Sequence, residues 1–205
     1  MATFLIAGCS PQSSRSPAPS PVGTEAPVIV PGSPGAPART ATPGERVGKT
    51  PSQAVAADVR FAEGMIPHHR QALEMTSLVE ARTTTETVRA LARRITAAQS
   101  PEVNAMTGWL TELGRTPPAG HAHTHAAGYG MATEEELAAL RAARGKAFDR
   151  LFLRLMTRHH EGAVKMAGEQ LANGRDQRMR LLARDVHTGQ GIEIDRMRQA
   201  LEALS

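Results

Sequence analysis

Two stretches of the chain place adjacent histidines between methionines, and such a combination can bind a soft metal ion. The first box is MIPHHRQALEM, from Met65 to Met75, and the second box is MTRHHEGAVKM, from Met156 to Met166. Histidine supplies an imidazole nitrogen and methionine a polarisable thioether, and thioether ligands favour Cu(I) among the first-row metals.

The two boxes belong to a longer internal repeat. A shift of 91 positions aligns His68 with His159, and the register then continues without a gap. The same shift aligns Asp58, Phe61, Leu91, Gln99, Glu102 and Met106 with Asp149, Phe152, Leu182, Gln190, Glu193 and Met197. We therefore expect a domain made of two copies of one unit.

Each unit has the apolar spacing of a helical hairpin. The pattern predicts long helices over residues 52–81, 85–113, 147–172 and 177–204, with a short helix that opens at Thr133 to Glu136 and is closed by Gly145. Because each hairpin can bury its apolar stripe only against the other, an all-α four-helix bundle follows. The repeats cover residues 55–113 and 146–204, and residues 114–145 join them.

Several residues are expected to define the ends of these helices or to bend them. A capping box over Thr50 to Gln53 should start the first helix, and Thr83 with Glu86 should cap the second. Asp176 should start the last helix, after Asn173 and Gly174 end the one before it. Pro67 and Pro101 each lack a backbone donor and should kink the helices that contain them.

Helical spacing brings polar side chains into the core. It directs His68 and His159 inward and places His69 and His160 at the flank, within reach of a neighbouring helix. It also buries a glutamine and a glutamate on each of the other two long helices. Buried carboxylates need partners, so these groups either form a hydrogen-bonded network that fixes helix register or share a cation.

We expect the shared cation. The candidate ligands in the boxes are Met65, His68, His69, Met75, Met156, His159, His160 and Met166. Four further residues are expected to act as ligands or as supports for the ligands, namely Glu102, Met106, Glu193 and Met197.

The segment between the units carries a second group of histidines. His121, His123 and His125 alternate in GHAHTHAAGYGM. Alternating histidines in a loop can bind copper, nickel or zinc, and we treat the three as an accessory metal site. The alternative is a polar linker that is rich in histidine.

The N-terminal residues predict a membrane anchor and a tether. Residues 1–9 resemble a truncated signal sequence that ends in a lipobox, with Cys9 as the lipidated residue. Residues 10–50 are rich in Pro, Ser, Gly and Ala and cannot bury enough apolar surface to fold, so we expect a disordered linker. The bundle would occupy residues 51–205.

Composition excludes some classes of protein. The net charge is +4, but only 3% of residues are aromatic and the arginines are spaced among glutamates. Nucleic-acid binding is therefore not expected. A single cysteine excludes an intramolecular disulfide. The sequence contains no run of about 18 apolar residues, so no transmembrane helix is predicted.

The paired boxes resemble those of the domain of unknown function 305 family, in which MxxHHxxAxxMA occurs twice, each time followed by LAxxI, QxxE and Met. Here the later motifs read LARRITAAQSPEVNAM and LARDVHTGQGIEIDRM, and Thr76 replaces the second alanine of the first box. The resemblance covers residues 55–204. It implies a ferritin-like four-helix bundle, usually exported, which in some members binds copper outside the cytoplasm.

The expected function is therefore extracytoplasmic copper binding, either at the outer face of a bacterial membrane through Cys9 or in the periplasm. The protein would sequester copper, as Cu(I) or Cu(II), or pass it to a partner protein, and iron or zinc are alternative ions. A carboxylate-bridged di-metal oxidoreductase is the alternative function on this fold. Such enzymes normally use a Glu-x-x-His motif, and this chain has Gln-x-x-Glu instead. A bundle that binds no metal and serves interactions is the third alternative, and no catalytic residue is predicted.

Overall fold

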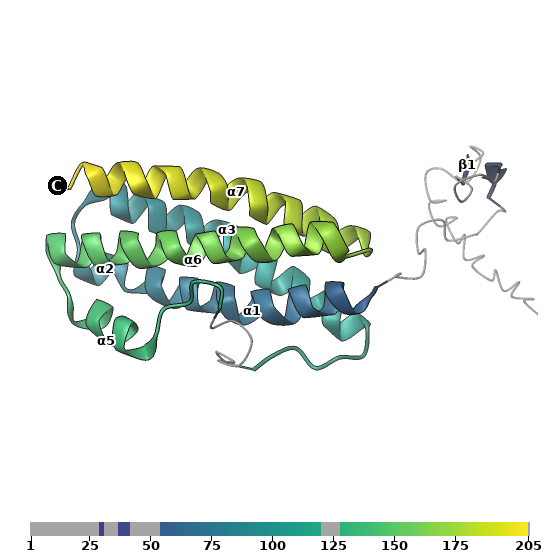
Figure 1. Ribbon diagram of the computed structural model, residues 1–205, viewed down its shortest axis with the longest axis horizontal. Helices are drawn as coiled ribbons and strands as arrows, with labels where there is room; N and C mark the ends of the chain where they lie inside the picture. The colour runs from purple at the N-terminus through teal and green to yellow at the C-terminus, as the bar shows by residue number, and fades with distance from the viewer. Residues whose placement is uncertain (1–28, 31–36, 42–53, 120–127, 205) are drawn as a thin grey trace, which may run out of the picture. The chain divides into compact units, whose positions relative to one another are not determined.

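Four long helices lie side by side in the computed structural model of the chain (Figure 1). The structure describes residues 29–30, 37–41, 54–119 and 128–204. The long helices are α1 (Ala56–Ser77), α3 (Glu86–Glu112), α6 (Gly145–Asn173) and α7 (Gln177–Glu202). Two short helices accompany them, α2 (Val79–Arg82) after α1 and α5 (Glu134–Ala142) before α6. The expected all-α class is confirmed for residues 54–119 and 128–204.

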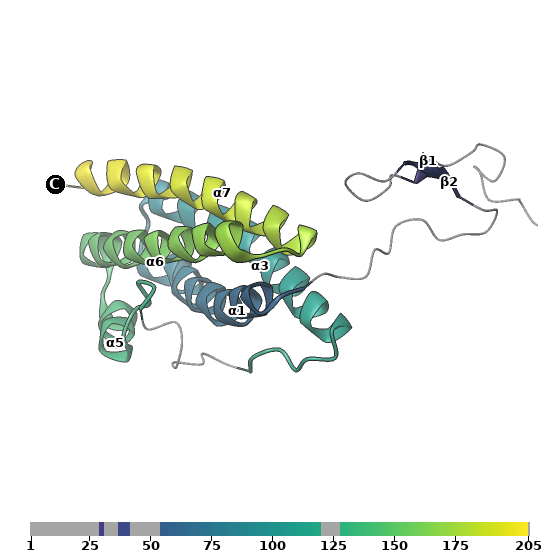
Figure 2. The ribbon, with the colours of Figure 1, turned by 45° about the vertical axis from the view of Figure 1, so that its right-hand side comes forward.

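The long helices pack as two hairpins laid against each other. α1 pairs with α3 and α6 pairs with α7, while α1 also contacts α6 and α3 contacts α7. The views in Figures 1 and 2 show that α1 and α6 run in opposite directions, as do α3 and α7. Among the described residues, no helix is both long and apolar enough to cross a membrane.

Some helix ends depart from the prediction. α1 begins at Ala56 rather than at residue 52. At this observed start, the Asp58 carboxylate accepts the N–H of Val55 at 2.8 Å. Thr83 does not cap α3, since Thr85 is the N-cap and its own N–H donates to the Thr83 hydroxyl at 3.0 Å. Gly145, with φ of 55°, opens α6 instead of closing α5. The predicted capping box at residues 50–53 lies outside the described residues.

Other ends follow the prediction. Thr133 and Glu136 form both bonds of a capping box on α5, at 2.9 and 3.2 Å. Asp176 caps α7 by accepting two backbone N–H groups, and α6 ends at Asn173. α1 and α3 each continue through their internal proline.

The buried Asp58 carboxylate ties the start of α1 to the turn between α6 and α7. Besides Val55, it accepts hydrogen bonds from the Gln170 amide at 2.5 Å and from the Arg175 N–H at 3.0 Å. Burial acts to raise the pKa of this carboxyl, but the hydrogen bonds outweigh it and the pKa is lowered. Asp58 therefore remains ionised at neutral pH and holds the hairpins together at this end.

A short strand pair departs from the expected structureless tether. β1 (Ile29–Val30) and β2 (Arg39–Thr40) pair antiparallel, with Ile29 opposite Thr40. Ile, Val and Thr are β-branched, which favours extended backbone over a fully irregular chain. Of the predicted tether, the structure describes residues 29–30 and 37–41 only, and Cys9 also lies outside the described residues.

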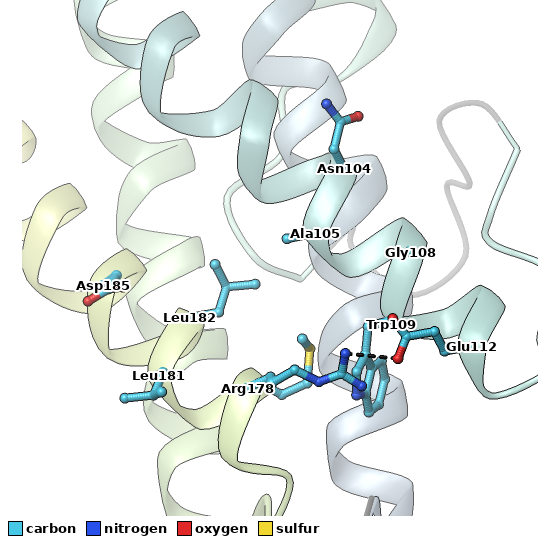
Figure 3. Close-up of a pocket in the computed structure, with 10 residues that line it drawn as sticks. Asn104, Ala105, Gly108, Trp109, Glu112, Arg178, Leu181, Leu182 and Asp185 are labelled. Atoms are coloured by element: carbon cyan, nitrogen blue, oxygen red, sulfur yellow. Dashed lines mark hydrogen bonds and ion pairs between the residues drawn. The ribbon is translucent and has the colours of Figure 1, made fainter. Parts of the chain in front are cut away.

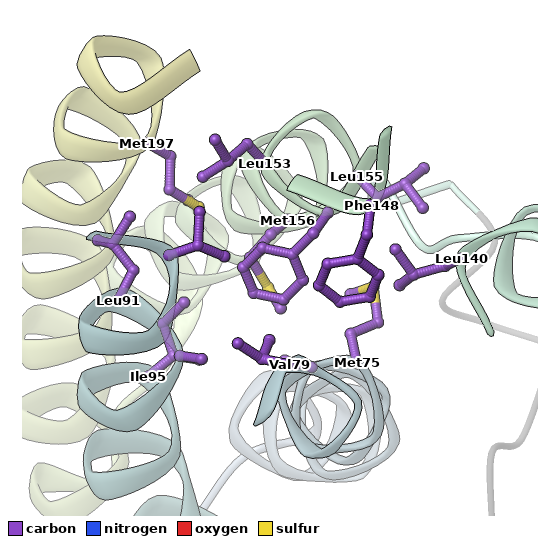
Figure 4. Close-up of a cluster of buried hydrophobic side chains, with 14 of the residues drawn as sticks. Met75, Val79, Leu91, Ile95, Leu140, Phe148, Leu153, Leu155, Met156 and Met197 are labelled. Carbon is purple, nitrogen blue, oxygen red and sulfur yellow. The ribbon is translucent and has the colours of Figure 1, made fainter. Parts of the chain in front are cut away.

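Two clusters of buried apolar side chains fill the bundle. The Phe148 cluster contains Phe148, Phe152, Met75, Met156 and Met197 together with aliphatic residues (Figure 4). The Trp109 cluster contains Trp109, Met65, Met106, Met166 and Met179. On α1 the box histidines lie between Met65 and Met75, so they occupy the level where the two clusters meet.

The segment Tyr129 to Ala132, which we call the strap, lies directly on α1 and α6. Both polar atoms of the Gln71 amide hold Ala132, through bonds of 2.7 Å to its N–H and 2.9 Å to its carbonyl. On α6, Gly162 leaves no room for a side chain, because a Cβ there would stand 1.7 Å from the carbonyl oxygen of Tyr129. The strap therefore depends on a glycine in the second box and a glutamine in the first.

Replacing Gly162 with alanine should displace the strap. The added methyl group overlaps backbone rather than a flexible side chain, so we expect the free energy of unfolding to fall by about 2–4 kcal/mol. Urea denaturation measures this change. The matched control is Gly168→Ala on the same helix, where nothing lies within 4 Å of the new Cβ and a gain of up to about 1 kcal/mol is expected. Equal effects of the two substitutions would contradict the proposed contact.

Candidate metal centre

Four histidine side chains form a fully buried layer across the middle of the bundle. His68 and His69 come from α1, His159 and His160 come from α6, and none has any exposed surface. The rings of His68 and His159 face each other with centroids 3.6 Å apart and planes tilted by 33°. The inward direction predicted for these two is confirmed. His69 and His160 reach the neighbouring helices α3 and α7, as expected, and their side chains are fully buried as well.

Each imidazole uses its Nε2 atom for a hydrogen bond within the protein. His68 Nε2 lies 2.9 Å from the carbonyl oxygen of Tyr129, and His159 Nε2 lies 2.9 Å from the carbonyl oxygen of His68. A carbonyl oxygen only accepts, so Nε2 carries the proton in both rings. The strap thus fixes the tautomer of His68, and α1 fixes that of His159.

The two flanking histidines pair with glutamates in equivalent ways. His69 Nε2 lies 2.8 Å from Glu102 Oε2 on α3, and His160 Nε2 lies 3.0 Å from Glu193 Oε2 on α7. Within each pair the glutamate follows the histidine by 33 residues. Glu193 is buried, whereas the Glu102 side chain keeps 18% of its surface exposed, so Glu102 lies less deep than its spacing predicted.

The Nδ1 atoms of all four rings are buried and have no hydrogen-bond partner within the described parts of the chain. Burial lowers the pKa of His68 to about 3, although the bond to Tyr129 opposes the shift. Burial also lowers the pKa of His159 well below its usual value, and lowers that of His160 against the opposing effect of Glu193. These three rings are neutral at pH 7, so each Nδ1 holds an unused lone pair, which is what a metal ion requires.

The glutamines predicted to enter the core are buried there without partners. Gln99 and Gln190 are 1% and 4% exposed, and neither amide has a hydrogen-bond partner among the described residues. Each lies one helical turn before the glutamate that pairs with a histidine. The predicted network is therefore only partly satisfied, through the two His–Glu pairs.

The methionines of one box do not converge on a single point. Met65 and Met75 are ten residues apart on α1, about 15 Å along the helix, and they belong to different clusters. Because α1 and α6 are antiparallel, Met65 shares the Trp109 cluster with Met166, and Met75 shares the Phe148 cluster with Met156. Met106 joins the first pair and Met197 joins the second.

Carboxylate and nitrogen donors alone do not form a metal site in this bundle. Over the described ranges, no three His, Cys, Asp or Glu side chains come together in a way that could hold an ion. What the core offers is unpartnered imidazole Nδ1 atoms, with the thioethers of Met65 and Met156 three residues before His68 and His159 on the same helices. This donor set suits a soft ion that accepts few ligands better than it suits zinc or iron.

Sequence reasoning missed the strap and Met179. The Tyr129 carbonyl carries no sequence signal, because every residue has one, although Gly162 inside a box was a hint of close backbone approach. Met179 has an inward helical position but no methionine counterpart in the first unit. The accessory residues His121, His123 and His125 lie outside the described residues.

The free energy of unfolding should fall as the pH is lowered from about 6.5. His68 titrates near 6.5 when unfolded and at about 3 when folded, so between these values the unfolded state binds the extra proton. The slope is about 1.4 kcal/mol per pH unit for each such histidine, and His159 and His160 shift in the same direction. Urea unfolding between pH 5 and 7.5 should show a shallower slope for His68→Gln than for the wild type. A slope in His68→Gln identical to that of the wild type would contradict the buried neutral ring.

Comparison with known proteins identifies relatives of the same fold. The family model described as "Domain of unknown function (DUF305)" matches residues 58–201. A DUF305 fragment from Deinococcus radiodurans is 35% identical, with a TM-score of 0.68 over 73% of this chain and 98% of that one. A Streptomyces coelicolor DUF305 protein predicted to be secreted is 33% identical, with a TM-score of 0.67 over 72% and 93%. No curated protein matches the chain.

A third relative has been solved with metal ions. The copper-bound structure of CopM in its Cu(II) form is 32% identical to this chain, with a TM-score of 0.64 over 72% of this chain and 97% of that one. CopM has also been solved in Cu(I)-bound and Ag-bound forms. The extent of the family match and the identity to these structures lead to one conclusion: the chain belongs to the DUF305 family.

Proposed function

We propose that this protein is an extracytoplasmic copper-binding protein that takes Cu(I) into the core of its bundle and sequesters it or passes it to a partner protein. The observation that carries the proposal is the histidine layer, in which every Nε2 is held by a fixed acceptor and every Nδ1 is left open. Cu(I) binding by the related CopM supports copper as the ion.

The two clusters suggest two sites. Met65 precedes His68 by three residues and Met156 precedes His159 by three, so each pair lies on one helix face with Cβ atoms about 5–6 Å apart. We assign one Cu(I) to His68 with Met65, Met106 and Met166, and a second to His159 with Met156, Met197 and Met75. His69–Glu102 and His160–Glu193 would support these sites or exchange ligands with them. We also propose that the bundle is ferritin-like and is built from two copies of one unit. The repeat would give the two sites corresponding ligands.

A purely structural polar layer is the second candidate. It is favoured by the hydrogen bonds that already satisfy each Nε2, because buried polar pairs can fix helix register. The unpartnered Nδ1 atoms and glutamine amides count against it, since a layer built only for structure would leave fewer such groups unsatisfied. A carboxylate-bridged oxidoreductase has less support, because Glu102 and Glu193 each engage a histidine on their own side of the layer.

The protein would act outside the cytoplasm, anchored through Cys9 to the outer face of the membrane by the linker at residues 10–50, or in the periplasm. The relation to a Streptomyces protein predicted to be secreted supports export. His121, His123 and His125, which precede the strap in sequence, would form an accessory metal site.

Changing His68, His69, His159 and His160 together to Ala should abolish tight uptake of Cu(I) by the core. The imidazoles supply the nitrogen donors, and thioethers alone bind the ion more weakly. An anaerobic titration against bicinchoninate, with the full-length protein at pH 7, measures the affinity and the number of ions bound. We expect two tightly held ions in the wild type.

Two controls separate the core from other sites. His187→Ala removes an exposed histidine and should leave both ions bound. Changing Met65 and Met166 to Leu should remove one ion and spare the other, because both residues belong to the Trp109 cluster. Unchanged uptake by the four-histidine variant would refute the core sites and leave the structural layer as the function of the histidines.

The anchor is tested separately. Mass spectrometry of the membrane fraction should find Cys9 as the first residue of the mature protein, carrying acyl chains. A Cys9→Ser variant should leave the membrane fraction, because lipidation supplies the membrane affinity. Recovery of mature protein with an unmodified Cys9 would rule out the lipid anchor without affecting the copper proposal.

A further inference from the structure

A surface groove of about 550 Å³ runs between the second half of α3 and the first half of α7. Its lining includes Gly108, Trp109, Met179 and Leu182 (Figure 3). Across it, Arg178 on α7 and Glu112 on α3 form an ion pair of 2.9 Å, drawn as a dashed line in Figure 3. Both side chains are more than half exposed, and such surface pairs contribute only about 0–1 kcal/mol, so the pair can open readily.

Met179 belongs both to this groove and to the buried core. It is only 2% exposed and packs in the Trp109 cluster with Met65, Met106 and Met166. It also lines the groove. A single thioether therefore connects the solvent side of the bundle with the interior methionines.

The four thioethers of the Trp109 cluster lie at increasing distances from the histidine layer. At 1.5 Å per residue, Met65 lies about 4 Å from the level of His68 along α1, and Met106 about 6 Å beyond Glu102 along α3. Met166 lies about 10 Å beyond His159 on α6, and Met179 about 21 Å from Glu193 on α7. Of the four, Met179 therefore lies farthest from the layer along its helix, and it is the one that lines the groove.

The Phe148 cluster has no fourth thioether. The residue that corresponds to Met179 in the first unit is Val88, which is fully buried in that cluster. The other members match one for one, since Met75, Met156 and Met197 correspond to Met166, Met65 and Met106. The extra methionine is therefore found at the groove and not at the equivalent place in the other half.

Trp109 also lines the groove. Its indole is 2% exposed, and its Nε1 atom has no hydrogen-bond partner among the described residues. Trp109 is also the only tryptophan of the chain, so its fluorescence reports on events in the groove.

We propose that the groove is the port through which Cu(I) enters and leaves the Trp109 cluster, with Met179 as its first ligand. This inference rests on the proposed copper-binding function. The ion would pass from solvent to the Met179 sulfur and then to the inner thioethers of the Trp109 cluster by ligand exchange. No bond other than the metal–sulfur bonds forms or breaks, and the ion keeps its oxidation state.

Met179→Leu tests the port, because leucine conserves volume and removes only the sulfur. In stopped-flow transfer of Cu(I) from the loaded protein to bicinchoninate, one of the two ions should leave about tenfold more slowly, equivalent to about 1.4 kcal/mol in the barrier. The equilibrium number of bound ions should remain two. When Ag(I) is mixed with the apo form of the Met179→Leu variant, the early change in Trp109 fluorescence that the wild type shows should be lost or delayed.

The matched control is Met131→Leu, which removes a thioether from the half-buried strap and should leave both rates unchanged. A wild-type transfer rate in Met179→Leu, with two ions bound, would overturn the port while leaving the copper function intact. Slow transfer in Met131→Leu but not in Met179→Leu would overturn it in favour of entry beneath the strap. If the wild type binds no copper, the proposed function itself fails. Thermal unfolding of both variants establishes that each is folded.

Discussion

The structure depends on burying four imidazole rings in one layer. A charged ring in a dry core is costly, and burial keeps His68, His159 and His160 neutral, so the N–H of each of these rings must be satisfied. The protein meets this requirement with two backbone carbonyls and two glutamates. Each acceptor fixes which nitrogen carries the proton. The second nitrogen of each ring is consequently left as a free donor of electrons in the core.

The antiparallel packing of the hairpins decides which methionines these nitrogens meet. A box contributes one methionine to each cluster, and each cluster receives methionines from both boxes. A copper site of the proposed kind in either half of the bundle would therefore require both hairpins, because neither hairpin holds a complete set of thioethers. Folding of the whole bundle would precede metal binding. This order suits a protein that stores or delivers a metal ion, in contrast to a protein whose folding depends on the ion.

Much of this arrangement could be predicted from the sequence, because it follows from helical spacing. The fold class, the inward direction of His68 and His159, and the burial of Gln99 and Gln190 all result from one periodicity. Helix ends were harder to predict, as at the start of α1, where the Asp58 carboxylate accepts the N–H of Val55. The division of the methionines between the two clusters could not be predicted without knowing which helices are antiparallel. The strap could not be predicted because it is held through backbone contacts, and the only trace of these in the sequence is a glycine.

The pair Gln71 and Gly162 has a consequence for the symmetry of the molecule. Both occupy the seventh position of their box, yet one clamps the strap with an amide and the other makes room for it. Two identical hairpins could not meet both demands, because two glutamines would crowd the loop and two glycines would leave it unheld. A symmetric homodimer of either half would therefore lose this element, and the joined chain allows the two halves to diverge where only one loop has to be seated.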